Sequence, residues 1–163
     1  MKFTILSVLL SSLALSLSAQ AEATVKLTGV HNCCGKCEKG IQAAVAKVEG
    51  ATVVADKGNV TITAKDEATA KKAEASLVAA GYAGAESTVP AVADAKVKSA
   101  TVKGVHLCCP KCVTAVDKAL KTVPGVTKNN ATKGADSFTV EGDFSKAALS
   151  SALKKGGFAG GIE

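Results

Sequence analysis

The stretch Gly29-Val30-His31-Asn32-Cys33-Cys34-Gly35-Lys36-Cys37 returns 75 residues later as Gly104-Val105-His106-Leu107-Cys108-Cys109-Pro110-Lys111-Cys112. The leading glycine, the valine, the histidine, the lysine and all three cysteines recur in register. Near the end of each copy, Gly81-Tyr82-Ala83-Gly84 corresponds to Gly157-Phe158-Ala159-Gly160. A repeat of this length predicts two homologous domains, 22–88 and 97–163, joined by a short tether at 89–96.

Working outward from the repeated loops, each copy alternates short strand-like and helix-like patterns. In the first copy, Thr24 to Val30 alternates as a strand does, and apolar residues from Ile41 to Val48 fall at helical spacing. Two short strands then flank a turn at 57–59, and a second helix is expected from about 66 to 80. The second copy repeats this order, with helices expected to end at Gly50 in the first copy and at Pro124-Gly125 in the second. The prediction is an α+β chain of two tandem ferredoxin-like βαββαβ domains, each with two helices on a four-stranded antiparallel sheet.

The N-terminus has the layout of a secretory signal peptide. Lys2 precedes an apolar, serine-diluted stretch from Ile5 to Leu17, and Ala19-Gln20-Ala21 is a small-residue cleavage motif. We expect residues 1–21 to be removed and the mature protein to be periplasmic or secreted. The alternative, a membrane anchor, is disfavoured because the stretch is short and rich in serine, so no membrane span is expected after cleavage.

Charge and composition argue against nucleic-acid binding. The formal net charge is +6, but the chain has no arginine, its lysines are interspersed with acidic residues, and aromatic residues make up only 3%. Enzymatic activity is also not expected, because the sequence shows no Ser/His/Asp set, no paired carboxylates and no phosphate-binding loop.

All six cysteines lie in the two repeated loops, and the only two histidines of the chain each lie two residues before them. Three thiols within five residues cross-link almost nothing, but they supply several soft ligands for one cation. Cys34 with Cys37, and Cys109 with Cys112, have the spacing that directs two sulfurs from a helix N-terminus toward one point. The helix N-terminus also favours the thiolate form.

The further candidate ligands are Cys33 and Cys108, which are alternatively available to a second protein during metal transfer, and His31 and His106. Two thiolates suit Cu(I) or Hg(II), three thiolates suit trigonal Cu(I), and three thiolates with an imidazole suit tetrahedral Zn(II). We expect about one ion per domain, with Cu(I) first among the candidates. Whether the two loops hold separate ions or share one is left open by the residues.

These loops and their surroundings resemble the heavy-metal-associated domains of copper chaperones, copper-pumping ATPases and periplasmic mercuric-ion binding proteins. The resemblance rests on the C-x-x-C pairs, on a glycine reached after twelve residues (Gly50 and Gly125), and on the closing Gly-aromatic pairs. It implies a ferredoxin-like fold and metal ligation by Cys34, Cys37, Cys109 and Cys112. The family's methionine is replaced by Val30 and Val105, and each loop is two residues longer, so the resemblance does not extend to the histidines or to Cys33 and Cys108.

The function predicted is capture of a soft or borderline cation, Cu(I), Zn(II) or Hg(II), by cysteine thiolates, followed by sequestration or transfer to a metal transporter or another metal-binding protein. One alternative is a thiol–disulfide redox protein that uses the C-x-x-C pairs. Another is a structural or adaptor module whose cysteines are simply oxidised. For Tyr82 and Phe158 we expect core packing near the site.

Overall fold

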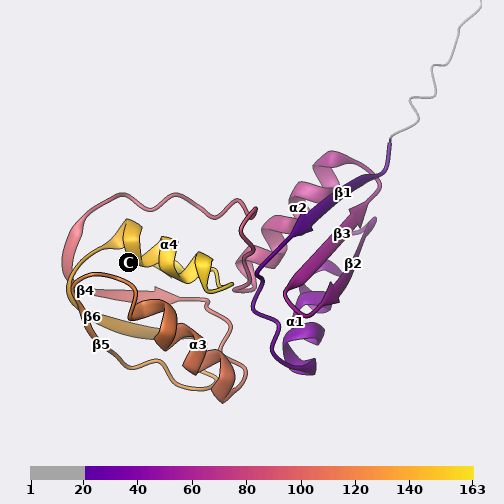
Figure 1. Ribbon diagram of the computed structural model, residues 1–163. Coiled ribbons are helices and arrows are strands. Elements are labelled where there is room, and N and C mark those ends of the chain that lie inside the picture. The colour runs from indigo at the N-terminus through magenta and orange to yellow at the C-terminus, as the bar shows by residue number, and fades with distance from the viewer. Residues whose placement is uncertain (1–20) are drawn as a thin grey trace, which may run out of the picture.

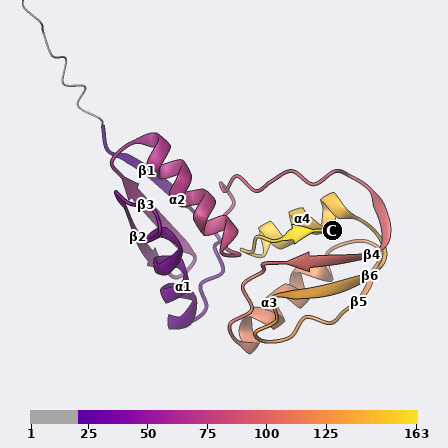
Figure 2. The same cartoon turned by 180° about the vertical axis from the view of Figure 1, so that it is seen from behind.

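The computed structural model describes residues 21–163. The predicted signal peptide, apart from Ala21, lies outside the described residues. Within them the chain is α+β, with four helices and antiparallel sheets (Figures 1 and 2). None of these helices has both the length and the apolar character needed to cross a membrane.

The first half of the described chain forms a three-stranded sheet with two helices. Its elements are β1 (Ala23–Leu27), α1 (Gly35–Val45), β2 (Ala51–Asp56), β3 (Asn59–Ala64) and α2 (Glu67–Ala79). The strands run in the order β1-β3-β2, all antiparallel, with Ile62 of β3 opposite Val25 and Val53. Alternate residues of β3 are buried beneath the helices, as the period of a strand with one covered face requires.

The second half repeats this order and adds a strand. Its elements are β4 (Lys96–Lys103), α3 (Pro110–Leu120), β5 (Val126–Asn129), β6 (Ser137–Ser145), α4 (Lys146–Lys155) and β7 (Gly161–Ile162). The sheet order is β5-β6-β4-β7, so the first strand of this half lies between the third and the fourth. This is the antiparallel order expected of a ferredoxin-like sheet.

The four-stranded sheet predicted for the first half is wrong, because its last strand does not form. The N–H of Thr28, which follows β1, is bound by the Glu86 carboxylate at 2.7 Å, and the Thr28 hydroxyl donates to the same group at 2.8 Å. A side chain therefore occupies the position that a ladder partner would take. Only Ala85 pairs with this edge through the backbone, donating to the Thr28 carbonyl at 2.8 Å.

Several predicted boundaries also shift. Helices α1 and α3 end at Val45 and Leu120 rather than at Gly50 and Gly125. Gly50 and Gly125, with φ of 81° and 87°, instead lie in the turns that lead into the next strands. Strand β4 begins at Lys96, the last residue of the stretch 89–96 that was expected to be a tether.

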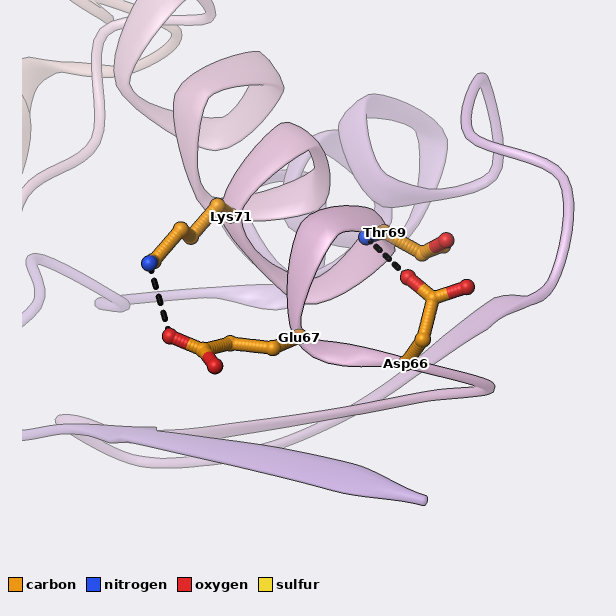
Figure 3. A network of polar contacts seen from close by, with 4 residues as sticks. All are labelled: Asp66, Glu67, Thr69 and Lys71. Carbon is orange, nitrogen blue, oxygen red and sulfur yellow. Dashed lines mark hydrogen bonds and ion pairs between the residues drawn. The ribbon is translucent and has the colours of Figure 1, made fainter. Parts of the chain in front are cut away.

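The start of α2 shows how local sequence fixes an element boundary. Asp66 is the N-cap, and its carboxylate accepts the backbone N–H of Thr69 at 2.6 Å (Figure 3). Across the first turn of the helix, Glu67 and Lys71 form an exposed i,i+4 ion pair at 2.7 Å. The predicted helix near 66–80 is thereby placed at Glu67–Ala79.

In each half both helices pack together and against the sheet, which places the hydrophobic core between the two layers. Fully buried side chains from strands and helices face each other there: Val60, Ile62, Ile41 and Leu77 in the first half, and Val102, Val140, Val116 and Leu149 in the second. Both views place α1 and α3 at the same end of the two-sheet assembly (Figures 1 and 2). The repeated cysteine loops lead into these two helices.

Candidate metal centre

Each cysteine loop is anchored at its base before it enters a helix. Val30 is buried and its N–H donates to the Gly58 carbonyl at 3.0 Å, while the Gly104 N–H donates to the backbone carbonyl of Asp136 at 2.9 Å. Cys34 and Cys109 are the N-caps of α1 and α3 and have an extended backbone. The second cysteine of each C-x-x-C pair therefore lies in the first helical turn, as the spacing predicts.

Within each loop the three sulfurs lie close together. The Sγ of Cys37 is 3.6 Å from that of Cys33 and 3.8 Å from that of Cys34. In the second loop, the Sγ of Cys112 is 3.8 Å from that of Cys108 and 3.6 Å from that of Cys109. The sulfurs of Cys33 and Cys108 thus converge with those of the C-x-x-C pairs instead of pointing away from them.

The two loops meet, so all six sulfurs form one cluster. The Sγ atoms of Cys37 and Cys112 are 3.9 Å apart. Cys33 lies 3.6 Å from Cys109 and 3.9 Å from Cys112, and Cys37 lies 3.7 Å from Cys108, all measured between sulfurs. All six cysteines are free thiols.

Burial divides the cluster into an inner and an outer part. Cys37 and Cys112 are 0% exposed and lie at the centre, in contact with sulfurs of both loops. The other four cysteines are half-buried. Cys34, Cys108 and Cys109 line a surface hollow of about 510 Å³, together with Lys36, Lys39 and Lys133. The inner thiols are thus shielded from solvent, and the hollow at the cluster is rimmed by positive charge.

The two histidines lie beside the cluster and are covered by aromatic rings from the opposite half. The ring of His31 stacks on Phe158 with 4.5 Å between centroids, and the ring of His106 lies 4.4 Å from that of Tyr82. Sequence reasoning placed Tyr82 and Phe158 in the core near the site, and both are buried. It did not find that each packs on the histidine of the other repeat, since only the docking of the two halves creates that contact.

Backbone hydrogen bonds hold these crossed contacts in place. Tyr82 and Phe158 form an isolated antiparallel bridge between the halves. Ala159 donates to the Gly81 carbonyl at 3.0 Å, and Ala83 donates to the Gly157 carbonyl at 3.3 Å. The halves are therefore joined through main-chain contacts next to the sulfur cluster.

The two histidines differ in their polar partners. The Tyr82 hydroxyl donates to the Cys37 carbonyl at 3.2 Å and lies within hydrogen-bond distance of both ring nitrogens of His106 (2.9 and 3.0 Å). Phe158 has no hydroxyl, and Nε2 of His31 is buried without a hydrogen-bond partner. Burial lowers the pKa of both imidazoles. At His106, electrostatic repulsion from His31 lowers the pKa further. Both rings are thus neutral near pH 7 and have a lone pair for a cation.

The pKa shifts separate the two N-cap thiols, Cys34 and Cys109, from Cys33, Cys108 and Cys112. At the helix N-termini, the nearby backbone N–H of Cys112 lowers the pKa of Cys109 to about 6, and that of Cys37 lowers the pKa of Cys34. Burial raises the pKa of Cys108 to about 12 and raises that of Cys33 and Cys112. The outer C-x-x-C thiols are therefore the ones poised as thiolates in the metal-free protein.

The donor atoms fall into three groups that are compact enough to hold an ion, with all ligand atoms of a group within 4.8 Å of one another. They are His31 with Cys33, Cys37 and Cys112; His106 with Cys37, Cys108 and Cys112; and Cys33 with Cys34 and Cys109. All eight residues singled out from the sequence belong to these groups. Every group includes donors from both halves.

The fold and this cluster define an α+β protein with a thiolate-rich candidate centre for a heavy-metal ion. No protein-family model matches the chain, and no curated protein matches it. Among solved structures, it is similar to the N-terminal soluble domains of CopA from Bacillus subtilis, with 16% identity and a TM-score of 0.34. The match covers 88% of this chain and 95% of that one.

Proposed function

We propose that this chain is an exported heavy-metal-binding protein that captures a soft or borderline cation, Cu(I), Zn(II) or Hg(II), through cysteine thiolates. The observation that carries the proposal is the convergence of six free sulfurs, with neighbouring Sγ atoms 3.6 to 3.9 Å apart. Ligands at the Zn–S distance of about 2.3 Å lie about 3.8 Å apart when they surround one ion tetrahedrally. The cluster thus has the spacing of a coordination shell.

The organisation proposed for this function is a pair of heavy-metal-associated domains, 22–88 and 97–163, with a variant His-x-Cys-Cys-x-x-Cys loop in each. The in-register repeat supports it, as does the ferredoxin-like strand order β5-β6-β4-β7 in the second half. The signal-like N-terminus supports export to the periplasm or outside the cell. No catalytic step belongs to the proposal.

The inner and outer division of the thiols supports transfer as well as storage. Cys34 and Cys109 line the hollow, so an incoming ion meets these thiolates first and then passes to the buried Cys37 and Cys112. The lysines that rim the same hollow suit docking of a metal transporter or metal-binding protein with an acidic face. Transfer in the opposite direction uses the same route.

The test is metal titration of the fully reduced chain from Glu22 to Glu163 under anaerobic conditions, with a parallel count of free thiols. We expect tight uptake of Cu(I), Zn(II) or Hg(II) that consumes the thiols, and no uptake by a control in which all six cysteines are replaced by serine. A reduced chain that binds none of these ions contradicts the proposal. Absence of uptake combined with rapid disulfide exchange supports the redox alternative instead.

A further inference from the structure

Two of the three donor groups have the same composition and overlap. Each contains the histidine and the first cysteine of one loop, which are His31 and Cys33 or His106 and Cys108. Each also contains both buried cysteines, Cys37 and Cys112. Neither group is complete within one half of the chain.

We propose that the two halves together build a dinuclear centre in which the thiolates of Cys37 and Cys112 bridge two cations. One cation is completed by His31 and Cys33, and the other by His106 and Cys108. The inference rests on the proposed metal-binding function and adds to it the number of ions, the ligands of each and the fact that the ions share sulfurs. It replaces the expectation of one independent site per domain.

The sulfur positions fit this arrangement. Cys33, Cys37 and Cys112 form a triangle with Sγ–Sγ edges of 3.6, 3.9 and 3.9 Å. Cys108, Cys112 and Cys37 form a second triangle with edges of 3.8, 3.9 and 3.7 Å. The triangles share the edge between Cys37 and Cys112, and all edges are near the spacing of about 3.8 Å that a tetrahedral thiolate shell requires.

The imidazoles supply the fourth ligand of each shell. Nε2 of His31 is a buried polar atom without a partner, and a polar atom in that position normally has one. Coordination of a cation would satisfy it. At the equivalent position, the Tyr82 hydroxyl lies 2.9 and 3.0 Å from the two ring nitrogens of His106, so it can accept a hydrogen bond from whichever nitrogen does not bind the cation.

Charge favours two divalent ions over one. The bridging sulfurs are completely buried and only 3.9 Å apart, so two thiolates in this position repel each other unless cations lie next to both. Two divalent cations balance the four thiolates of Cys33, Cys37, Cys108 and Cys112, and the four thiol protons are released to solvent. The buried core then has no net charge, which avoids the cost of burying an unpaired charge.

The experiment is NMR of the reduced chain loaded with an NMR-active cadmium isotope, which is a tetrahedral probe with high affinity for thiolates. We expect two cadmium resonances of sulfur-rich type, each split by scalar coupling to the other cadmium through the shared sulfurs. Two resonances without mutual splitting, or a single bound cadmium, would overturn the dinuclear centre and leave the proposed metal binding intact. A chain that takes up no cadmium and none of the other soft ions overturns both.

Serine variants separate bridging from terminal ligands. Cys33→Ser should shift the resonance of the ion bound with His31, leave the other ion bound and keep the splitting, because both bridging sulfurs remain. Cys37→Ser should displace or shift both resonances. Asn32→Ser, in the same loop but in none of the donor groups, is the control and should keep both resonances and their splitting. A Cys37→Ser protein that loses one resonance and leaves the other unchanged contradicts the proposal, and the splitting in the unmodified chain tests it even where a variant does not fold.

Discussion

At the scale of single residues, six chemically identical side chains acquire different properties from their positions. Cys109 caps α3 and faces the surface hollow, and its pKa is lowered to about 6. Cys112, one turn away, is completely buried, and burial raises its pKa. The same amino acid thus serves as an accessible thiolate at one position and as a shielded inner donor at the other.

This difference predicts an order of alkylation by iodoacetamide in the metal-free, reduced chain. Because Cys109 has a pKa of about 6, its thiolate predominates at pH 7 and is lost as the pH falls below 6. Cys109 and Cys34, both with lowered pKa values, should therefore react before Cys33, Cys108 and Cys112 at pH 7, and the rate of Cys109 should fall about tenfold for each further pH unit below 6. Cys108, with a pKa of about 12, should react far more slowly at pH 7.

Peptide mass spectrometry after short pulses of reagent measures the order. Denatured protein is the control, because there the six thiols should react at similar rates. Equal rates for Cys109 and Cys108 in the folded chain would contradict the assigned environments.

At the scale of elements, the turns after α2 and α4 determine how the halves dock. Gly157 has a φ of 87°, and a Cβ on it would collide with the backbone at Gly29 and His31 of the opposite half. Gly81 has a φ of 89° and faces Gly104 and His106 in the same way. These glycines permit a backbone approach between halves that no other residue allows.

Gly157→Ala should consequently destabilise the protein more than a left-handed backbone alone explains. Gly104→Ala is a matched control, because Gly104 also has a positive φ of 74° but its added Cβ would meet nothing within 4 Å. We expect a loss of about 1 to 2 kcal/mol in the free energy of unfolding for Gly104→Ala. For Gly157→Ala we expect on the order of 3 kcal/mol or more. Denaturant titration of the two variants tests this, and equal losses would contradict the close contact between the halves.

The sequence was sufficient to predict most helices and strands, but not the contact between the two halves of the chain. Apolar spacing predicted α1 and α3 but extended each of them to the following glycine, while α2 lies close to its predicted range. The three-stranded first sheet was not predicted, because the Glu86 side chain takes the place of a strand partner. No local sequence pattern indicates that a side chain will pair with a strand edge in this way. The sharing of Cys37 and Cys112 was missed for a related reason, since contacts between two copies of a repeat leave no periodicity in either copy.

The sequence contains one signal of the packing around Tyr82 within the first half. Gly40 of α1 leaves room for the Tyr82 hydroxyl, because a Cβ there would collide with it. The corresponding residue of α3, 75 positions later, is Ala115, and the corresponding aromatic residue is Phe158, which lacks the hydroxyl. Thus Gly40 occurs in the half that contains Tyr82, and Ala115 occurs in the half that contains Phe158. The structure explains this pairing, because only the tyrosine hydroxyl requires the space that the glycine leaves.

At the scale of the whole molecule, each half is small and buries a modest core. Donors from both halves contribute to every candidate metal group, so a bound ion stabilises the docked arrangement and not just one half. Cations at about a thousandfold excess over their dissociation constant add about 4 kcal/mol per site to the stability of the folded state.

We therefore expect cadmium to raise the midpoint of thermal unfolding of the reduced chain and to give one cooperative transition for both halves. A strong chelator should reverse the change. The variant with all six cysteines replaced by serine should show no response to cadmium, which separates binding at the cluster from binding at surface carboxylates. A cadmium-loaded chain that unfolds in two separate steps would contradict coupling through the centre.

The exchange of aromatic rings between the halves has a consequence for the origin of the chain. A single copy of this unit would contain both a loop histidine and an aromatic ring that packs on such a histidine. Two identical copies could therefore form the same pair of histidine–aromatic contacts about a true two-fold axis. Gene duplication with fusion would turn that self-pairing, which depends on concentration, into a permanent intramolecular one. The reciprocal contacts of Tyr82 with His106 and of Phe158 with His31 thus give this single polypeptide the layout of a two-fold homodimer.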